Sequence, residues 1–428
     1  MSSPSPFLWP KSLDSIEPKD ETTTHGAQKA RCLIYLTSFV HREELFDVAE
    51  RWLCNRLEPQ DGLRITQILI CDGFILGETL DSLTRLLLSA VYNVPFTTRR
   101  VHFKGELRDI ICRATNGLTP REEQLIWGFK DNPDYFYVEA PVDGTVCLDP
   151  EGRLLALYRI KRPRRIAEKA NRYIAGWIFQ MVRERAQQMA EERARHIGIP
   201  LEHLLTPEEE MASEFVLAEE TIAQAFREGK ARLNKKALTI NDVGGIKVIG
   251  EKGMLARLEA FLLDHPTIKV LEREEHHGTY RARSLIIEVP WSKDRVCRSY
   301  LASKAWEKYR DRGIPEKKLM KGIDSLLEGT ASTICLELIL STSPDLIESE
   351  LGLSIHEERI TAQRNRKVYR GYIPMNVEFL IEYLFAVALS PKSRIDRLPV
   401  KLWGRYLPDT ISYHIRQLYY LSEHDALY

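Results

Sequence analysis

The chain has 428 residues, more than one ordinary hydrophobic core accommodates, so its length predicts two or three domains. Lys and Arg together number 61, as do Asp and Glu, and the formal net charge is zero. The absence of a global basic field counts against non-specific binding to DNA, and any phosphate site must depend on local clusters of charge.

The cysteines and the N-terminus indicate a cytoplasmic protein. The seven cysteines are widely spaced and include no CxxC pair, which is typical of reduced, buried thiols. Residues 1–28 have no cationic start followed by an apolar stretch, so we expect a flexible leader and no signal peptide. The most apolar window, residues 379–389, contains Glu382 and is too short to cross a bilayer, so we expect no membrane association.

Residues 29–140 alternate strand-like and helix-like patterns, which predicts an N-terminal α/β domain of unknown role. Strand-like runs cover 31–40 and 65–76, and helical spacing covers 41–57 and 79–91. Asp72 would then end a strand, where a turn is a better explanation than a metal ligand. Turn-forming residues between 130 and 144 mark the boundary with the next domain.

A cationic segment after this boundary joins a strand to a helix. It contains Arg159, Lys161 and Lys169. A helix N-terminus carries free N–H groups and a partial positive charge, and Arg can bind phosphate in a bidentate manner, so the segment suits phosphate groups. An exposed basic turn is the simpler alternative.

Two isolated acids, Asp242 and Glu337, lie far along the chain on apolar strand-like runs. A carboxylate in such a strand must be paired, bound to a metal or turned toward water, because burying it alone is costly. Carboxylate oxygens are also the ligands that Mg²⁺ takes in nucleotide-processing sites. Strand-like runs at 238–249, 284–289 and 332–340 alternate with helical patterns, which predicts a mixed sheet with helical cover.

Four blocks of the second half resemble, in order, the synthetase domain of the RelA/SpoT family. That family makes ppGpp and pppGpp by transferring pyrophosphate from ATP to the 3′-hydroxyl of GDP or GTP. The blocks are Arg159-Ile160-Lys161 with Lys169, similar to RxK…SIxxK; Asp242 to Lys247, similar to DIxGxR; Gly278 to Ile287, similar to NGYRSLHLIV; and Glu337 to His356, similar to ExQIRT…AExGxAAH. Together they cover residues from about 155 to 360.

The resemblance implies an α+β, nucleotidyltransferase-like fold with a mixed sheet, and a role for each matching residue. Arg159, Lys161 and Lys169 would bind ATP, Asp242 and Glu337 would bind Mg²⁺, and Tyr280, Arg281 and His356 would bind the acceptor nucleotide. Glu337 would also accept the proton of the attacking hydroxyl. These assignments are consistent with phosphoryl-transfer chemistry, which depends on positioning and on neutralising phosphate charge.

The chain also differs from the family pattern at Arg165, Ser284, Ile339 and Ser341, where the family has Ser, His, Gln and Arg. Polar groups are what discriminate strongly between similar ligands, and Ile339 provides none. The acceptor is therefore left open between GDP, GTP, an adenine nucleotide and tRNA.

We expect four segments: a leader at 1–28, the N-terminal α/β domain at 29–140, a synthetase-like domain at 150–360 with a helical insertion at about 173–235, and a helical portion at 361–428. The favoured function is a nucleotide pyrophosphokinase whose partners are ATP and an acceptor nucleotide. The alternatives are a catalytically silent nucleotide-sensing or protein-interaction module with the same fold, and an RNA-binding regulator. Nucleic acid is not the favoured partner, and the choice between monomer and homo-oligomer is left open.

Overall fold

The computed structural model describes residues 35–92, 94–113, 117–201, 204, 208–230, 239–352, 358 and 371–421. The expected leader at 1–28 lies outside this set, as does His356, one of the expected acceptor-binding residues.

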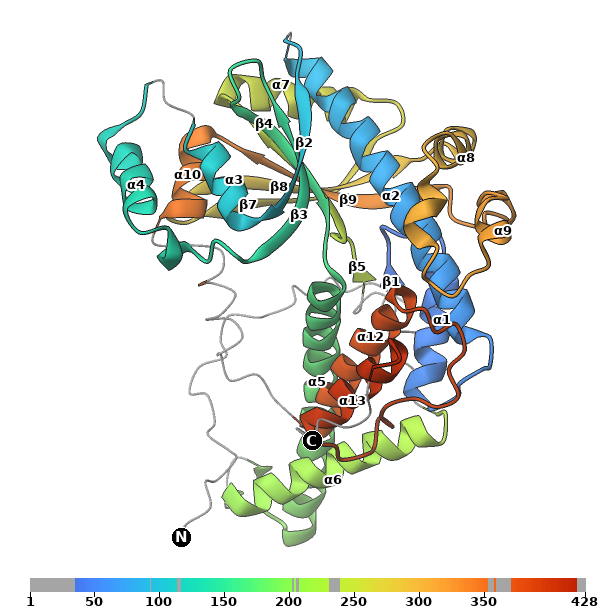
Figure 1. The fold of residues 1–428 in the computed structure, drawn as a ribbon. Helices are drawn as coiled ribbons and strands as arrows, with labels where there is room; N and C mark the ends of the chain where they lie inside the picture. The colour runs from blue at the N-terminus through green and yellow to red at the C-terminus, as the bar shows by residue number, and fades with distance from the viewer. Residues whose placement is uncertain are drawn as a thin grey trace, which may run out of the picture.

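A mixed sheet of seven strands forms the centre of the described structure, in the order β2-β3-β4-β6-β9-β8-β7 (Figure 1). The strands are β2 (Thr97–Phe103), β3 (Pro141–Leu148), β4 (Leu154–Ile160), β6 (Gly244–Ile249), β7 (Lys269–His277), β8 (Arg281–Pro290) and β9 (Thr333–Ser341). Strands β6 and β9 are parallel, and the other neighbouring pairs are antiparallel. A separate parallel pair joins β1 (Tyr35–Leu36) to β5 (Thr239–Ile240).

Helices cover the sheet and extend beyond it. They are α1 (Arg42–Leu53), α2 (Asp61–Val91), α3 (Lys104–Ile111), α4 (Pro120–Asp131), α5 (Pro163–Ile197), α6 (Glu208–Arg227), α7 (Lys252–Asp264), α8 (Lys293–Ala302), α9 (Glu316–Leu319), α10 (Ser343–Leu351), α12 (Tyr372–Leu389) and α13 (Pro408–Leu418). Three short 3₁₀ helices are η1 (Pro133–Phe136), η4 (Ala305–Tyr309) and η5 (Asp324–Leu326).

The two faces of the central strands differ in chemistry because side chains alternate along a strand. Ile246, Val248, Leu336 and Leu338 are buried in the core that α2 covers. Their neighbours Gly245, Lys247, Glu337 and Ile339 face the opposite side, which is less buried. Helices α3, α4 and α10 share a second core on that side. The part of this face that carries Glu337 holds the candidate site.

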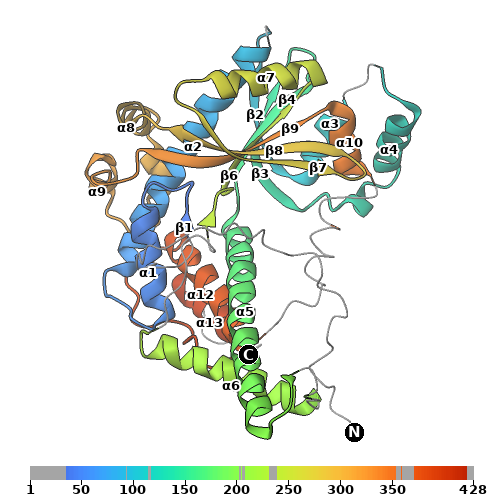
Figure 2. The same ribbon diagram turned by 180° about the vertical axis from the view of Figure 1, so that it is seen from behind.

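A helical bundle lies beside one end of the sheet (Figures 1 and 2). In it α12 packs against α5, α2, α13 and α1, and α6 contacts α5. Of the described helices, α12 alone has the length and hydropathy of a membrane span, and 61% of that window is buried inside the protein. Its apolar side chains thus form the core of the bundle.

The predicted α+β class with a mixed sheet and helical cover is confirmed. The strand expected at 65–76 is wrong, because these residues lie within α2, a single helix of 31 residues. Ile65, Ile68 and Ile75 are fully buried there, since α2 packs on both the sheet and the bundle. Burial on several sides weakens helical periodicity, and the many isoleucines imitate a strand.

Two further features differ from the expected layout. Of the strand expected at 31–40, the described residues form only β1. Strand β2, from the region expected to be a separate N-terminal domain, pairs with β3 in the same sheet as β4, β6 and β9. The boundary expected at 140–150 therefore falls within β3 of a continuous sheet.

Candidate functional site

One row of residues crosses four strands of the sheet. Arg159 of β4 lies opposite Gly245 of β6, which lies opposite Glu337 of β9, which lies opposite Ile286 of β8. Residues in one row point to the same face of a sheet. Gly245 has no side chain, and a Cβ placed there would be 3.7 Å from Glu337 Oε2. The glycine therefore leaves open the space between the Arg159 and Glu337 positions.

Asp242 and Glu337 converge on one ammonium group. Asp242 precedes β6 and forms ion pairs with Lys161 and with Lys169, whose Nζ is 2.6 Å from Oδ2. Lys161 Nζ is also 3.6 Å from Glu337 Oε2. The structure thus brings together Lys161, Lys169, Asp242 and Glu337.

Local structure positions both lysines. Lys161 follows β4, and its N–H donates to Val243 O at 2.7 Å, which continues the pairing of β4 with the chain leading into β6. Pro163 then begins α5, where its fixed φ suits the first helical position. Lys169 lies nearly two turns into this helix, so its side chain reaches back to Asp242.

The charges around Asp242 favour its ionised form. Burial alone would raise the pKa of Asp242, but the ammonium groups of Lys161 and Lys169 outweigh burial and lower it. Oδ1 of the same carboxylate is buried and has no hydrogen-bond partner among the described residues. An orphaned carboxylate oxygen beside a second carboxylate is a donor set that fits a hard cation such as Mg²⁺. Asp242 and Glu337 are the residues that would hold it.

Glu337 has a second polar neighbour, which sequence reasoning noted only as a departure from the family. Ser284 Oγ donates to Glu337 Oε1 at 3.4 Å. Ser284 lies opposite Ile339 in the next row, so the hydroxyl reaches Glu337 diagonally between β8 and β9. Ser284 and Lys161 therefore hold the two oxygens of the Glu337 carboxylate from different sides.

A buried cluster of charge lies beside the row. Lys104 Nζ is 2.8 Å from Glu350 Oε2, Arg108 Nη2 is 3.8 Å from the same oxygen, and Lys247 Nζ is 4.0 Å from Oε1. Burial alone would raise the pKa of Glu350, but Lys104 and Lys247 outweigh it and lower the pKa strongly. Burial, with the nearby charges of Lys104 and Arg159, lowers the pKa of Lys247. Sequence reasoning missed Lys104 because no pattern connects it to α10.

Two of the expected acceptor-binding residues, Tyr280 and Arg281, lie away from Glu337. Tyr280 lies in the turn between β7 and β8, six residues from Ile286, which corresponds to about 20 Å along an extended strand. Its ring centroid is 4.6 Å from that of His276. The Arg281 N–H donates to Asp345 Oδ1 at 2.8 Å, at the N-terminus of α10. The described contacts do not join Tyr280 or Arg281 to Glu337, and His356 lies outside the described residues.

Asp72 is neither in a turn nor at the end of a strand. It is buried in the middle of α2, with Oδ1 2.5 Å from His41 Nδ1. The other ring nitrogen, Nε2, is 2.6 Å from Leu326 O. Both ring nitrogens have an oxygen partner, so His41 fixes the start of α1 to α2 and η5. Burial raises the pKa of Asp72, although its contacts with His41 oppose the rise. Burial alone would lower the pKa of His41, but Asp72 and the Leu326 carbonyl outweigh it and raise the pKa.

Comparisons with known proteins give two solved structures of weak similarity. One is the small alarmone synthetase 2 from Bacillus subtilis, with 13% identity, covering 40% of this chain and 71% of that chain at a TM-score of 0.18. The other is a GTP pyrophosphokinase family protein from Streptococcus pneumoniae, with 11% identity. The match covers 50% of this chain and 86% of that chain at a TM-score of 0.19. No family model and no curated protein matches the chain. At these TM-scores the two structures carry no argument about function.

Proposed function

We propose that this protein is an ATP-dependent nucleotide pyrophosphokinase that acts at the charged cluster of Lys161, Lys169, Asp242 and Glu337. The observation that carries the proposal is that Asp242 and Glu337 share the Lys161 ammonium, while Oδ1 of Asp242 is buried and has no hydrogen-bond partner in the described part of the chain. Two carboxylates and two ammonium groups in one place are the groups that phosphate-transfer chemistry requires.

Each residue has a distinct task in this proposal. Lys161 and Lys169 neutralise the phosphates of ATP, and Arg159 lies two strands from Glu337 across the gap at Gly245. When bound, Mg²⁺ would supply further neutralisation of phosphate charge at Asp242 and Glu337. Glu337 accepts the proton of the acceptor hydroxyl, whose oxygen attacks the β-phosphorus of ATP. The bond between the α-phosphate and the β-phosphate then breaks, and AMP leaves.

The acceptor is the ribose hydroxyl of a nucleotide. Ile339 offers no hydrogen bond that would select one base over another. That apolar side chain lies between Lys247 and Ser284 in the row beside Glu337. Incubation of the purified protein with ATP, Mg²⁺ and each of GDP, GTP, ADP and tRNA, followed by chromatography, tests the reaction. AMP together with a pyrophosphorylated acceptor is the expected result, and Glu337→Gln should abolish both. If no acceptor is modified and Glu337→Gln behaves as wild type, the enzymatic proposal is wrong.

One observation favours the silent nucleotide-binding module as a second candidate. Lys161 and Lys169 already neutralise Asp242, so phosphates could replace the carboxylate as partner of the lysines without turnover. Calorimetric titration of ATP separates the two candidates. The enzyme requires Mg²⁺ for productive binding, whereas the silent module binds ATP equally well with EDTA and makes no AMP.

A further inference from the structure

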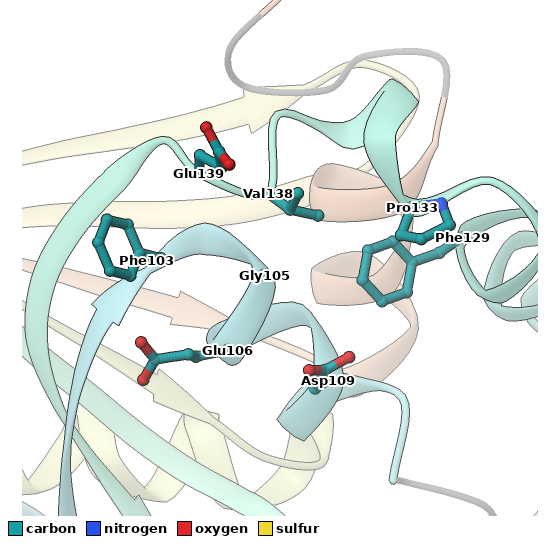
Figure 3. A pocket seen from close by; sticks show the side chains of 8 residues that line it. All are labelled: Phe103, Gly105, Glu106, Asp109, Phe129, Pro133, Val138 and Glu139. Carbon is teal, nitrogen blue, oxygen red and sulfur yellow. The ribbon is translucent and has the colours of Figure 1, made fainter.

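A cavity of about 740 Å³ lies beside α3 and η1, and none of its lining residues belongs to the charged cluster of Lys161, Lys169, Asp242 and Glu337 (Figure 3). Its size is in the range of ligand-binding pockets. The apolar part of the lining includes Phe103, Phe129 and Val138, and the acidic part consists of Glu106, Asp109 and Glu139. The two places differ in chemistry, since the charged cluster holds two ammonium groups with its two carboxylates, whereas the lining of this pocket holds carboxylates and no cation.

The walls of the pocket are held by backbone contacts. The Gly105 N–H donates to Val138 O at 2.9 Å, and the Lys104 N–H donates to Ala140 O at 2.9 Å. A Cβ at Gly105 would be 3.1 Å from Val138 Cβ, so glycine permits this close approach of α3 to the segment before β3. On the other side, Phe129 packs edge-on against Phe136 with ring centroids 5.3 Å apart. The pocket is thus preformed.

The carboxylates of the pocket have no side-chain partner within the described ranges. Glu106 and Asp109 are three residues apart on α3 and so lie on one face of this helix, and Glu139 belongs to the facing segment. Among the described residues, none of the three forms an ion pair or a hydrogen bond, and no cation lines the pocket. Interaction with the helix dipole explains the acidic residue Glu106 in the first turn of α3. It does not explain the acidic residues Asp109 and Glu139.

An exposed aromatic ring accompanies these charges. Phe103 ends β2 with 48% of its surface exposed, while Phe129 is buried. In the view of Figure 3, Phe103 and Phe129 lie at the two ends of the pocket with Val138 between them. Aromatic rings bind cations through their faces as well as apolar groups through contact area.

We propose that this pocket is the docking site for a segment of a partner protein that presents an arginine or lysine side chain next to an apolar side chain. The basis for choosing this occupant is charge complementarity, because three carboxylates that no described cation neutralises attract a cation and repel phosphates. The pocket is thereby unsuited to RNA, to DNA and to anionic lipid surfaces. A lone guanidinium group would neutralise carboxylates but leave the ring of Phe103 in water, whereas a peptide covers both.

The test uses the full-length protein and the fluorescein-labelled peptide Gly-Arg-Leu-Arg-Gly, followed by fluorescence anisotropy at low salt. A peptide with citrulline in place of arginine is a neutral comparison of nearly equal shape. We expect saturable binding of the arginine peptide, weakened about fivefold or more by citrulline and by the variant Glu106→Gln/Asp109→Asn/Glu139→Gln. Phe103→Ala should weaken the arginine peptide as well.

A matched control changes the net charge by the same amount at another place on the surface. The variant Asp264→Asn/Asp311→Asn/Glu328→Gln alters three exposed carboxylates that form no ion pair among the described residues, and it should bind the peptide as wild type does. Absence of saturable binding overturns the proposal, as does equal weakening in this control, which would mean attraction to net charge alone. If arginine amide competes as strongly as the unlabelled peptide does, the pocket is a site for small cations and the peptide-docking proposal is wrong. An oligonucleotide that displaces the peptide would also contradict the proposal.

Discussion

Gly245 and Glu337 lie directly opposite each other on the parallel strands β6 and β9, and the glycine keeps the carboxylate accessible from the Arg159 side. The adjacent glycine faces the other side of the sheet. A Cβ at Gly244 would be 2.7 Å from Leu76 Cδ1 and 2.9 Å from Leu336 Cδ2, within the core under α2. Two neighbouring glycines therefore serve different purposes, one in the site and one in packing.

Alanine substitutions separate these purposes. Gly244→Ala overpacks the core between α2 and β9 and should lower the free energy of unfolding by about 1 kcal/mol or more. Gly245→Ala makes only ordinary contacts with Glu337 and should change it by less than about 0.5 kcal/mol. Urea unfolding of both variants provides the measurement. The assignment of the two faces would be wrong if Gly245→Ala were the more destabilising.

A larger side chain at position 245 tests whether the substrate uses the space beside Glu337. Gly245→Val places methyl groups in the space between the Arg159 and Glu337 positions, so turnover should fall at least about tenfold because the reacting groups are displaced. Stability measured in parallel should change little, since Gly245 is not in the core. Unchanged activity would show that this space is not used by the substrate.

Removal of the carboxylate at Glu337 tests its chemical role. Glu337→Gln keeps the shape and the possibility of a hydrogen bond with Ser284, but it cannot accept a proton. We expect kcat to fall by about 10²- to 10⁴-fold, the usual contribution of a general base. Ser284→Ala is the comparison, because it leaves the carboxylate in place and should have a much smaller effect. Equal losses in both variants would assign Glu337 a positioning role.

The buried ion pair between Lys104 and Glu350 should be important for stability. Lys104→Met leaves the Glu350 carboxylate buried with less compensation, and loss of one partner of a buried pair costs about 3 kcal/mol or more. Arg121→Met on α4 is a matched control, because its partner Glu348 lies on the same helix α10 as Glu350 but forms a more exposed pair worth about 0.5 kcal/mol. Chemical unfolding monitored by circular dichroism distinguishes them, and similar losses would contradict the structure.

The raised pKa of His41 makes stability depend on pH. Because its pKa is raised in the folded state, its contribution is complete below its unfolded value of about 6.5 and is lost as the pH rises through the folded value. The difference in unfolding free energy between wild type and His41→Gln should therefore shrink as the pH rises from about 6 to about 9. His102→Gln, which removes an exposed pair with Asp143, should show no such trend. A constant difference for His41→Gln would indicate that the ring is neutral.

Much of the fold follows from local patterns in the sequence, and the exceptions have physical causes. Alternating apolar residues identify β6, β8 and β9, because one face of each is buried. Strand β7 escaped prediction because nearly all its residues are exposed and many are charged, so it depends on pairing with β8 and not on burial. The strand wrongly expected at 65–76 reflects the opposite case, in which burial on several sides hides the helical period of α2.

The candidate site divides in the same way. Sequence order identified Asp242 and Glu337 as isolated acids, but only the pairing of β6 with β9 brings them to one ammonium group. Lys104 and Ser284 have no local signature, since their roles depend on strands and helices distant in the chain. Tyr280 and Arg281 were assigned by resemblance alone, and their binding role is still a prediction.

Helix α2 makes the N-terminal region an integral part of the protein. It packs on β4 and β6 along one length and on α12 along another, so a single rod supports both the sheet and the bundle (Figure 1). Proteolytic removal of everything before residue 92 would remove the helix that packs on the strands carrying Arg159 and Gly245. The remaining fragment would expose a large apolar surface to solvent and should aggregate, even though every residue proposed to take part in the reaction would still be present.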